Sequence, residues 1–163
     1  MAGSGINQAI HWAIRAWPEL DSETLYSVLA ARAAVFVVEQ NCPYQDLDGL
    51  DPAGIHIIAS ADDGAVLAYG RLLPAGVRFR EPSIGRVLTT SRGRGKGLGK
   101  VLMQRCLEQA RQRFRDQPIR ISAQQYLERF YQDLGFVTVS DPYDEDGIPH
   151  IEMLAVESEQ RKR

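Results

Sequence analysis

Cysteine is scarce in this chain of 163 residues, which has two, Cys42 and Cys106. They lie far apart and form no Cys-x-x-Cys pair, so neither a disulfide framework nor a zinc site is expected, and a reducing compartment fits best. We therefore expect no bound metal. The chain is long enough to bury a hydrophobic core without such cross-links.

Long apolar runs and an excess of one charge are also missing. No apolar run approaches the roughly 20 residues that cross a bilayer, and residues 1–8 lack the basic and apolar regions of a signal peptide. The formal net charge of −2 gives no electrostatic reason to bind nucleic acid. By elimination we expect a cytoplasmic protein whose partner is neither a membrane nor a nucleic acid.

The composition that remains is typical of an ordinary globular domain. Hydrophobic residues make up 44% of the chain and charged residues 25%, and the length favours one domain. We expect that domain at residues 9–156, with a flexible N-terminus at 1–8 and a polar tail at 157–163.

Strand and helix patterns follow one another along the chain. Asp21 or Ser22 can cap the first helix, and the Asp-Gly pair at 63–64 suits a tight hairpin turn. The predicted elements, in order, are a strand at 11–17, a helix at 25–36, strands at 56–61, 66–73 and 84–90, a helix at 98–114, a strand at 118–122, a helix at 126–134, and strands at 136–139 and 150–156. This order predicts a mixed α/β structure with helices packed on a sheet.

A glycine-rich turn joins the strand at 84–90 to the helix at 98–114. Its sequence is Arg92-Gly93-Arg94-Gly95-Lys96-Gly97-Leu98-Gly99-Lys100. The start of a helix has unpaired N–H groups and the positive end of the helix dipole, so it binds anions. Glycines let the backbone approach phosphate oxygens, and the arginine and lysine side chains can neutralise phosphate charge. A glycine-rich helix entry without a ligand is the alternative.

Two common phosphate motifs do not match this turn. A P-loop requires a hydroxyl residue after its Gly-Lys, but Val101 follows Lys100, and Arg94 stands where the first glycine belongs. Hydrolysis of a nucleoside triphosphate is therefore disfavoured. The dinucleotide fingerprint also fails, because neither Leu98 nor Lys100 supplies its third glycine.

The turn resembles the cofactor signature of the Gcn5-related N-acetyltransferase (GNAT) superfamily, Arg/Gln-x-x-Gly-x-Gly/Ala. Arg94, Gly97 and Gly99 match it. A shifted match that begins at Arg92 also exists, but the first gives the better helix register.

A second segment of this superfamily reads Asn-x-x-Ala-x-x-x-Tyr-x-x-x-Gly-Phe. Tyr131, Gly135 and Phe136 match it, whereas Gln124 replaces the asparagine and Leu127 the alanine. Gln124 keeps an amide, so part of the hydrogen-bonding capacity remains.

Longer strings are similar to the ElaA-type subfamily. They lie at 34–46, 84–87 and 146–151, and the whole resemblance runs from about residue 25 to 153. It implies the GNAT fold, a central mixed and mostly antiparallel sheet with a splayed cofactor strand and flanking helices. It also implies an N-acetyltransferase that uses acetyl-CoA as cosubstrate, with no particular acceptor.

The resemblance also implies where the cosubstrate binds. The pantetheine arm would lie beside the strand at 84–90, and the pyrophosphate would bind N–H groups of the turn. The implied binding residues are Val87, Leu88, Thr89, Arg94, Gly95, Lys96, Gly97, Leu98, Gly99, Lys100, Gln124 and Tyr131.

Three residues are candidates for catalysis. Tyr131 is the candidate general acid, since the family places this tyrosine near the CoA sulfur and a phenol has a pKa near that of a thiol. Glu39 and His150 are candidates for deprotonating or binding the acceptor amine, and each has a purely structural alternative. His56 is a weaker candidate. Arg86 would either orient the acceptor or pair with a carboxylate of the protein.

The expected acceptor is a primary amine on a small molecule or a peptide. Two acidic loops, around 39–51 and 141–146, favour a cationic amine, because clustered carboxylates attract cations. Aspartates are also common in turns for local reasons. The alternatives are a CoA-binding sensor or interaction module without transferase activity, and a phosphate- or RNA-binding module. An exposed sheet edge would support a homodimer.

Overall fold

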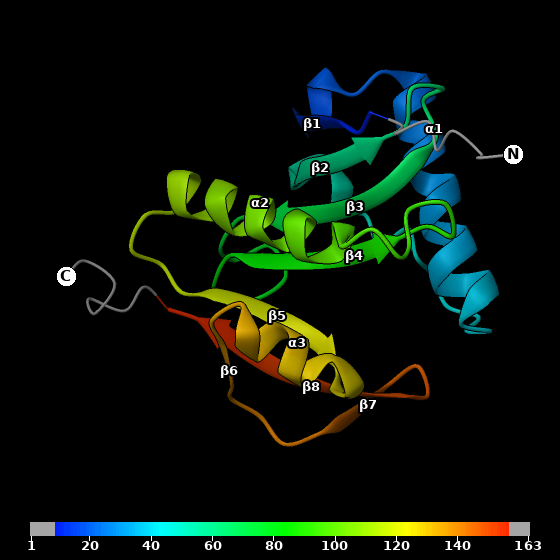
Figure 1. Cartoon of the computed structure of the whole chain (residues 1–163). Helices are drawn as coiled ribbons and strands as arrows, with labels where there is room; N and C mark the ends of the chain where they lie inside the picture. The colour runs from blue at the N-terminus through cyan, green and yellow to red at the C-terminus, as the bar shows by residue number, and fades with distance from the viewer. Residues whose placement is uncertain (1–8, 157–163) are drawn as a thin grey trace, which may run out of the picture.

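In the computed structural model, residues 9–156 are described, and they form one eight-stranded sheet with helices on both faces (Figure 1). The expectations for residues 1–8 and 157–163 fall outside the described residues. The strands are ordered β1-β2-β3-β4-β5-β8-β6, and β7 pairs with β8 outside this path. Only β4 and β5 are parallel neighbours. The predicted mixed, mostly antiparallel sheet is therefore confirmed.

The elements agree closely with the sequence pattern. In chain order they are β1 (His11–Ala16), α1 (Ser22–Arg32), a π-helix (Ala33–Glu39), β2 (Ile55–Ser60), β3 (Val66–Leu73), β4 (Ser83–Thr89), α2 (Leu98–Arg113), β5 (Ile119–Gln124), α3 (Glu128–Asp133), β6 (Phe136–Thr138), β7 (Tyr143–Glu145) and β8 (Ile148–Ala155). Short 3-10 turns occur at Trp17–Glu19, Asp51–Ala53 and Gln125–Leu127.

The predicted helix at 25–36 consists of two parts. Asp21 begins α1, because its side chain accepts a hydrogen bond from the backbone N–H of Thr24 at 2.7 Å. After Arg32 the helix widens into the π-helix, which carries Glu39 at its end. A π-helical segment is rare and is frequently found at functional sites, and here it forms part of a pocket wall.

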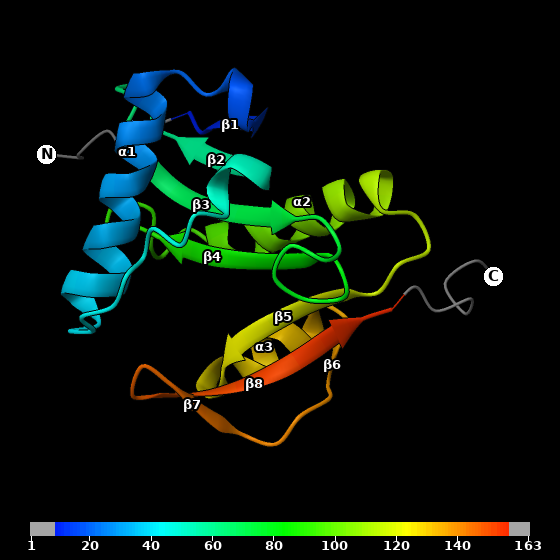
Figure 2. The ribbon, with the colours of Figure 1, turned by 180° about the vertical axis from the view of Figure 1, so that it is seen from behind.

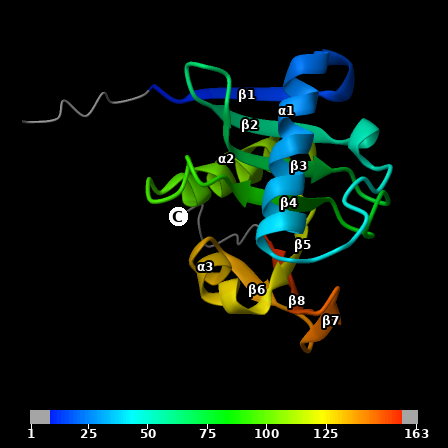
Figure 3. The ribbon, with the colours of Figure 1, turned by 90° about the vertical axis from the view of Figure 1, so that its right-hand side faces the viewer.

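Two hydrophobic cores cover opposite faces of the sheet. The helices α2 and α3 lie on one face and α1 lies on the other (Figures 1 and 2). On β2, Ile57 belongs to the core under α2, whereas the next residue, Ile58, packs with Val28 and Tyr69 under α1. This alternation is the period of two expected of a strand covered on both faces. Figure 3, seen from the right-hand side of Figure 1, shows α1 lying across the strands in front of the sheet.

The strands β4 and β5 separate soon after they meet. They pair only at Ser83 and Arg120, and beyond that point the sheet opens. A bulge in β4 adds to the opening, because Gly85 pairs with Arg71 and Leu88 with Tyr69, which leaves two residues of β4 opposite one of β3. One of the two, Arg86, has a φ of 51°. The opening between these strands holds the candidate site.

One strand was not predicted. The segment at 141–146 reads as a loop, but β7 forms there and pairs with β8, which begins two residues earlier than expected. The turn between them is Asp146-Gly147, with φ of 53° and 83°. Positive φ at both central residues is typical of a tight two-residue hairpin turn, and Asp-Gly is a favoured sequence for that turn.

Candidate functional site

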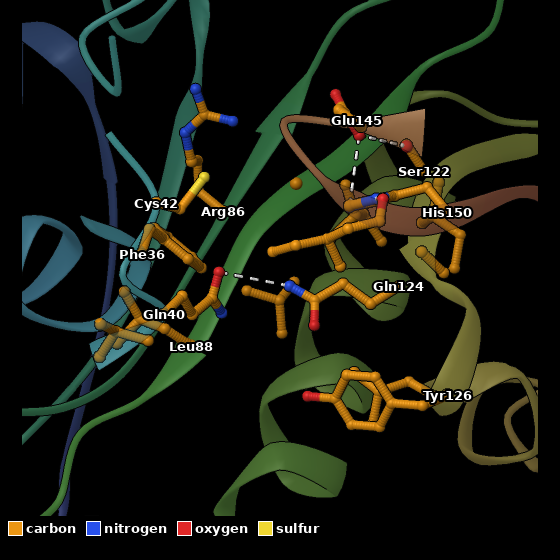
Figure 4. A pocket seen from close by; sticks show the side chains of 18 of the residues that line it. Phe36, Gln40, Cys42, Arg86, Leu88, Ser122, Gln124, Tyr126, Glu145 and His150 are labelled. Carbon is orange, nitrogen blue, oxygen red and sulfur yellow. Dashed lines mark hydrogen bonds and ion pairs between the residues drawn. The ribbon is translucent and has the colours of Figure 1, made fainter. Parts of the chain in front are cut away.

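A pocket of about 570 Å³ fills the opening between β4 and β5. Figure 4 shows one wall made by the π-helix, the following loop and β4, and the facing wall made by β5 and the β7–β8 hairpin. Residues labelled on the first wall are Phe36, Gln40, Cys42, Arg86 and Leu88, and on the second Ser122, Gln124, Tyr126, Glu145 and His150. The amide of Gln124 reaches that of Gln40 at 3.5 Å across the pocket.

The glycine-rich turn lies at one end of the pocket. The N-cap of α2 is Gly97, with a φ of 71° and no capping side chain, so the first N–H groups of this helix have no side-chain partner. Gly95 also has a positive φ, of 77°. A Cβ atom on Gly93 would lie 2.1 Å from the carbonyl oxygen of Leu67, so packing requires glycine there. The exposed helix entry has the features of an anion site.

Arg94 connects this turn with the π-helix. Its Nη2 donates to the carbonyl oxygen of Thr89 at 3.0 Å, and its Nη1 lies 3.4 Å from Oε1 of Glu39, whose other oxygen contacts Nη2. The two side chains are 45% and 38% exposed. A predicted phosphate-binding cation and a predicted base are therefore ion-paired with each other.

Tyr131 lies within α3 and lines the pocket. Its ring packs edge-on against Phe130 and Phe136, with centroids 5.1 and 5.8 Å away. The residue is 7% exposed and lines the pocket, and burial raises the pKa of its phenol well above the usual range. Among residues 9–156 its hydroxyl has no hydrogen-bond partner. The hydroxyl therefore keeps its proton and is available to a ligand.

A polar cluster occupies the other end of the pocket. Glu145 accepts a hydrogen bond from Ser122 at 3.1 Å and from Arg78 at 3.2 Å, and its Oε2 lies 3.3 Å from Nε2 of His150. Tyr143 bonds the Ser122 hydroxyl and stacks on the His150 ring. Burial is the main reason that the pKa of Tyr143 is raised.

The partners of His150 fix where its protons lie. Nδ1 is 2.7 Å from the carbonyl oxygen of Ile148, which only accepts, so Nδ1 carries a hydrogen. Nε2 of the neutral ring is then a bare acceptor that faces the Glu145 carboxylate, another acceptor. The contact between them is an ion contact without the direction of a hydrogen bond. Among residues 9–156 no group donates a hydrogen bond to Nε2, so this nitrogen is open to a donor on a ligand.

The first acidic loop does not present free charge, contrary to the interpretation that it attracts a cation. Its aspartates form one buried network with three arginines: Asp46, Asp48 and Asp51 with Arg32, Arg71 and Arg86. Burial alone would raise the pKa of Asp51, but hydrogen bonds from Arg32 and Arg71 lower it. Arg86 likewise has carboxylate partners within the protein, which was one of its two predicted roles.

His56 belongs to the core and not to the pocket. Its Nδ1 lies 2.6 Å from the Tyr69 hydroxyl, and its Nε2 lies 3.0 Å from the carbonyl oxygen of Asp51. The side chain is buried, and burial lowers its pKa. The weaker candidate for a proton shuttle is therefore a structural histidine.

Most of the predicted site residues meet in this pocket. Those that line it are Glu39, Arg86, Val87, Leu88, Thr89, Arg94, Gly99, Gln124, Tyr131 and His150. The others, Gly95, Lys96, Gly97, Leu98 and Lys100, lie in the adjoining turn and the first turn of α2, where the side chain of Leu98 is buried. The sequence did not single out Ser122, and it indicated Glu145 only as a member of the second acidic loop, at 141–146. The alternating burial of β5, which places Ser122 and Gln124 on one face, was the signal for Ser122.

Splayed parallel strands, a bulged β4 and a glycine-rich entry to α2 define the protein as an acyltransferase of the GNAT fold. The family model of the acetyltransferase (GNAT) domain matches residues 26–156. The chain therefore belongs to the GNAT acetyltransferase family, as its sequence indicated.

Similar proteins place the chain in the ElaA-type subfamily. Protein ElaA of Escherichia coli is 44% identical over 146 residues, which cover 88% of this chain and 95% of ElaA. The crystal structure of E. coli ElaA superposes with a TM-score of 0.84 at 41% identity, covering 90% of this chain and 99% of that chain. An acyl-CoA N-acyltransferase from Pseudomonas aeruginosa has a TM-score of 0.85 at 42% identity, covering 91% and 100%.

Two further observations concern the described part of the chain. Within residues 9–156 no group of three or more His, Cys, Asp or Glu side chains is placed to hold a metal ion. No helix in this range is long and apolar enough to cross a membrane.

Proposed function

We propose that the protein is an acetyl-CoA-dependent N-acetyltransferase that moves an acetyl group to a primary amine by direct attack in a ternary complex. The observation that carries this proposal is that three groups suited to the reaction meet at one pocket. They are an open helix entry that fits an anion, the hydroxyl of Tyr131, which has no partner among residues 9–156, and the His150–Glu145 pair.

The residues around the opening fit the CoA portion of the donor. Beyond Ser83 the edge of β4 that faces β5 has no strand partner, so backbone groups of Val87 and Thr89 would be available to the amides of a pantetheine arm, the Thr89 carbonyl once Arg94 has left it. The diphosphate would bind the first N–H groups of α2, with Lys96 and Lys100 nearby. A Cβ atom would meet nothing within 4 Å at Gly95 or Gly97, so this side of the turn is open.

Tyr131 would assist departure of the thiolate. Burial that raises its pKa keeps the hydroxyl protonated but also makes it a weaker acid than a solvated phenol. The role that fits this environment is a hydrogen bond to the negative charge that develops on sulfur. Tyr131 would transfer its proton fully to the CoA thiolate only if burial in the pocket raises the pKa of the CoA thiol as much as that of the phenol.

His150 would take the proton of the acceptor amine. Its Nε2 is the free acceptor of the ring, and the Glu145 carboxylate, 3.3 Å from Nε2 and paired with Arg78, would offset the charge of the protonated ring. Glu39 is the second candidate, but its carboxylate is paired with Arg94.

The acceptor would be a primary amine of a small molecule or a peptide. Of the three carboxylates that line the pocket, Glu39 and Glu145 have arginine partners, whereas among residues 9–156 the Asp146 side chain has none. While these pairs are in place, a cationic amine has one unpaired carboxylate to meet its charge, fewer than the sequence suggested.

A ligand-dependent thermal shift tests the donor first. Acetyl-CoA at about 100 times its Kd should stabilise the fold by about 2.7 kcal/mol, whereas ATP, NAD and inorganic phosphate at the same concentration should not. A panel of amines is then assayed for release of free thiol. Binding without thiol release from any amine would instead favour a CoA-binding module, and no shift at millimolar acetyl-CoA would refute the proposal.

A further inference from the structure

The Arg94–Glu39 ion pair joins two parts of the pocket that the reaction uses separately. Arg94 belongs to the turn that would hold the diphosphate, and Glu39 ends the π-helix in the wall that would face the acceptor. A guanidinium binds a carboxylate and a phosphate with the same donors. Contacts with Glu39 and with the Thr89 carbonyl engage both Nη atoms, and the carboxylate offsets the guanidinium charge, so the paired side chain is a weaker site for a diphosphate.

A diphosphate should displace Glu39 from Arg94 readily. Both side chains are more than one-third exposed, and exposed pairs contribute little to stability. A diphosphate offers more negative charge than one carboxylate and would lie directly over the N-terminus of α2, where the helix dipole adds to the attraction. When the donor is bound, Arg94 should therefore contact the diphosphate and not Glu39.

We propose that Glu39 competes with the diphosphate of the acyl donor for Arg94, so that donor binding transfers Arg94 from Glu39 to the phosphate oxygens. This inference rests on the proposed function. The transfer leaves the Glu39 carboxylate free inside the pocket, where it can receive the acceptor amine. Glu39 thus weakens donor binding and becomes available only when the donor is bound, a coupling that acts equally in both directions.

The competition also predicts for which acyl donors the Kd depends on Glu39. A thioester of CoA carries the diphosphate and must displace the carboxylate. S-acetylpantetheine has the same reactive end and the same arm but no diphosphate, so Glu39 should not affect its binding.

The adjacent ion pair supplies a matched control. Arg92 belongs to the same turn and pairs with Asp63 at 2.9 Å, with side chains 44% and 62% exposed, and neither residue lines the pocket. Asp63→Asn removes the same charge near the same turn as Glu39→Gln does. It does not release Arg94.

Calorimetric titration with acetyl-CoA and with S-acetylpantetheine tests the inference on the full chain. We expect Glu39→Gln to lower the Kd of acetyl-CoA by about two- to fivefold, the factor of an exposed ion pair, and to leave that of S-acetylpantetheine unchanged. Asp63→Asn should change neither. In an Arg94→Ala background Glu39→Gln should have no effect on acetyl-CoA, because the competition is already absent.

Each result is decisive. Unchanged or weaker acetyl-CoA binding by Glu39→Gln refutes the competition, and so does equal tightening by Asp63→Asn or in the Arg94→Ala background. If the wild-type protein binds no acetyl-CoA, the proposed function fails and the competition fails with it. If the wild type binds acetyl-CoA and Glu39→Gln behaves identically, only the competition fails.

Discussion

Asp51→Asn should destabilise the protein more than any exposed charge change. Oδ1 of Asp51 accepts from Nη1 of Arg32 at 2.6 Å and from Nη1 of Arg71 at 2.8 Å. The arginine side chains are 1% and 0% exposed. Removing one partner of a buried pair costs about 3–5 kcal/mol, because the remaining charge stays buried without compensation. The amide keeps the shape but not the charge.

Asp51→Asn affects two buried arginines, but each of them keeps another carboxylate partner. The loss of unfolding free energy should therefore not exceed the range for one broken buried pair. Arg32 keeps Asp46 at 2.9 Å and Arg71 keeps Asp48 at 2.8 Å. We therefore expect the free energy of unfolding to fall by about 3–5 kcal/mol, a large share of the roughly 5–15 kcal/mol typical of a domain. Urea unfolding of both proteins measures the difference. Asp63→Asn, which removes an exposed partner of Arg92, should cost at most about 1 kcal/mol.

Acid should reduce the difference between wild type and Asp51→Asn. The pKa of Asp51 is lower in the folded protein than in the unfolded chain. Its contribution is therefore complete above the unfolded value of about 3.9 and is lost as the pH falls below it towards the folded value. A loss at neutral pH no larger than that of Asp63→Asn would refute the reasoning, since the buried arginines would then not need the carboxylate.

Three further changes test the site. Tyr131→Phe should lower turnover by about 100-fold or more with little change in the Kd of acetyl-CoA; unchanged thiol release would remove its role at the sulfur. His150→Ala should lower kcat and flatten its dependence on pH without weakening acetyl-CoA binding, and retention of the wild-type profile would leave His150 a structural residue. Gly93→Ala should cost about 1–3 kcal/mol of stability, because its Cβ would lie 2.1 Å from the Leu67 carbonyl oxygen; a wild-type unfolding midpoint would contradict the close packing.

Local patterns predicted the fold because local physics determines most of its elements. The strand at 56–61, the Asp21 cap and the glycine-rich entry to α2 were each predicted from patterns within a few residues. The π-helix was missed because its wider period continues an apolar helical stretch without a break. The β7 strand was missed because Asp144 and Glu145 hide the strand pattern, although Asp146-Gly147 carried the Asp-Gly hairpin signal. At Asp63-Gly64, where that signal was used, a hairpin does form, but only Gly64 has a positive φ.

The partners of charged residues could not be predicted in the same way. Asp46 binds Arg32, 14 residues away, and Glu39 binds Arg94, 55 residues away. Sequence shows that a loop is acidic but not which cations fold against it, so the first loop was interpreted as a surface for cations. The same limit applies to Glu145, whose position beside His150 depends on a hairpin that sequence did not reveal.

Arg86 links the buried network to the cosubstrate strand. It lies in the bulge of β4 with a φ of 51°, a conformation that costs energy in any residue but glycine. Such a conformation persists where the surroundings fix it. Here Nη2 donates to the Asp46 carbonyl oxygen at 3.0 Å, and Nε lies 2.8 Å from Oδ1 of Asp46 in an ion contact that is not a directed hydrogen bond.

The Tyr44 ring lies on the same guanidinium, with its centroid 5.6 Å from Cζ. The loop that begins at Cys42 therefore holds the bulge in place, and the bulge turns Val87 and Thr89 towards the pocket. The three aspartates interpreted from sequence as a surface for the acceptor are thus structural groups. They shape the strand along which the donor is proposed to bind, so loss of Asp46 or Asp48 should weaken binding of acetyl-CoA although neither residue would touch it.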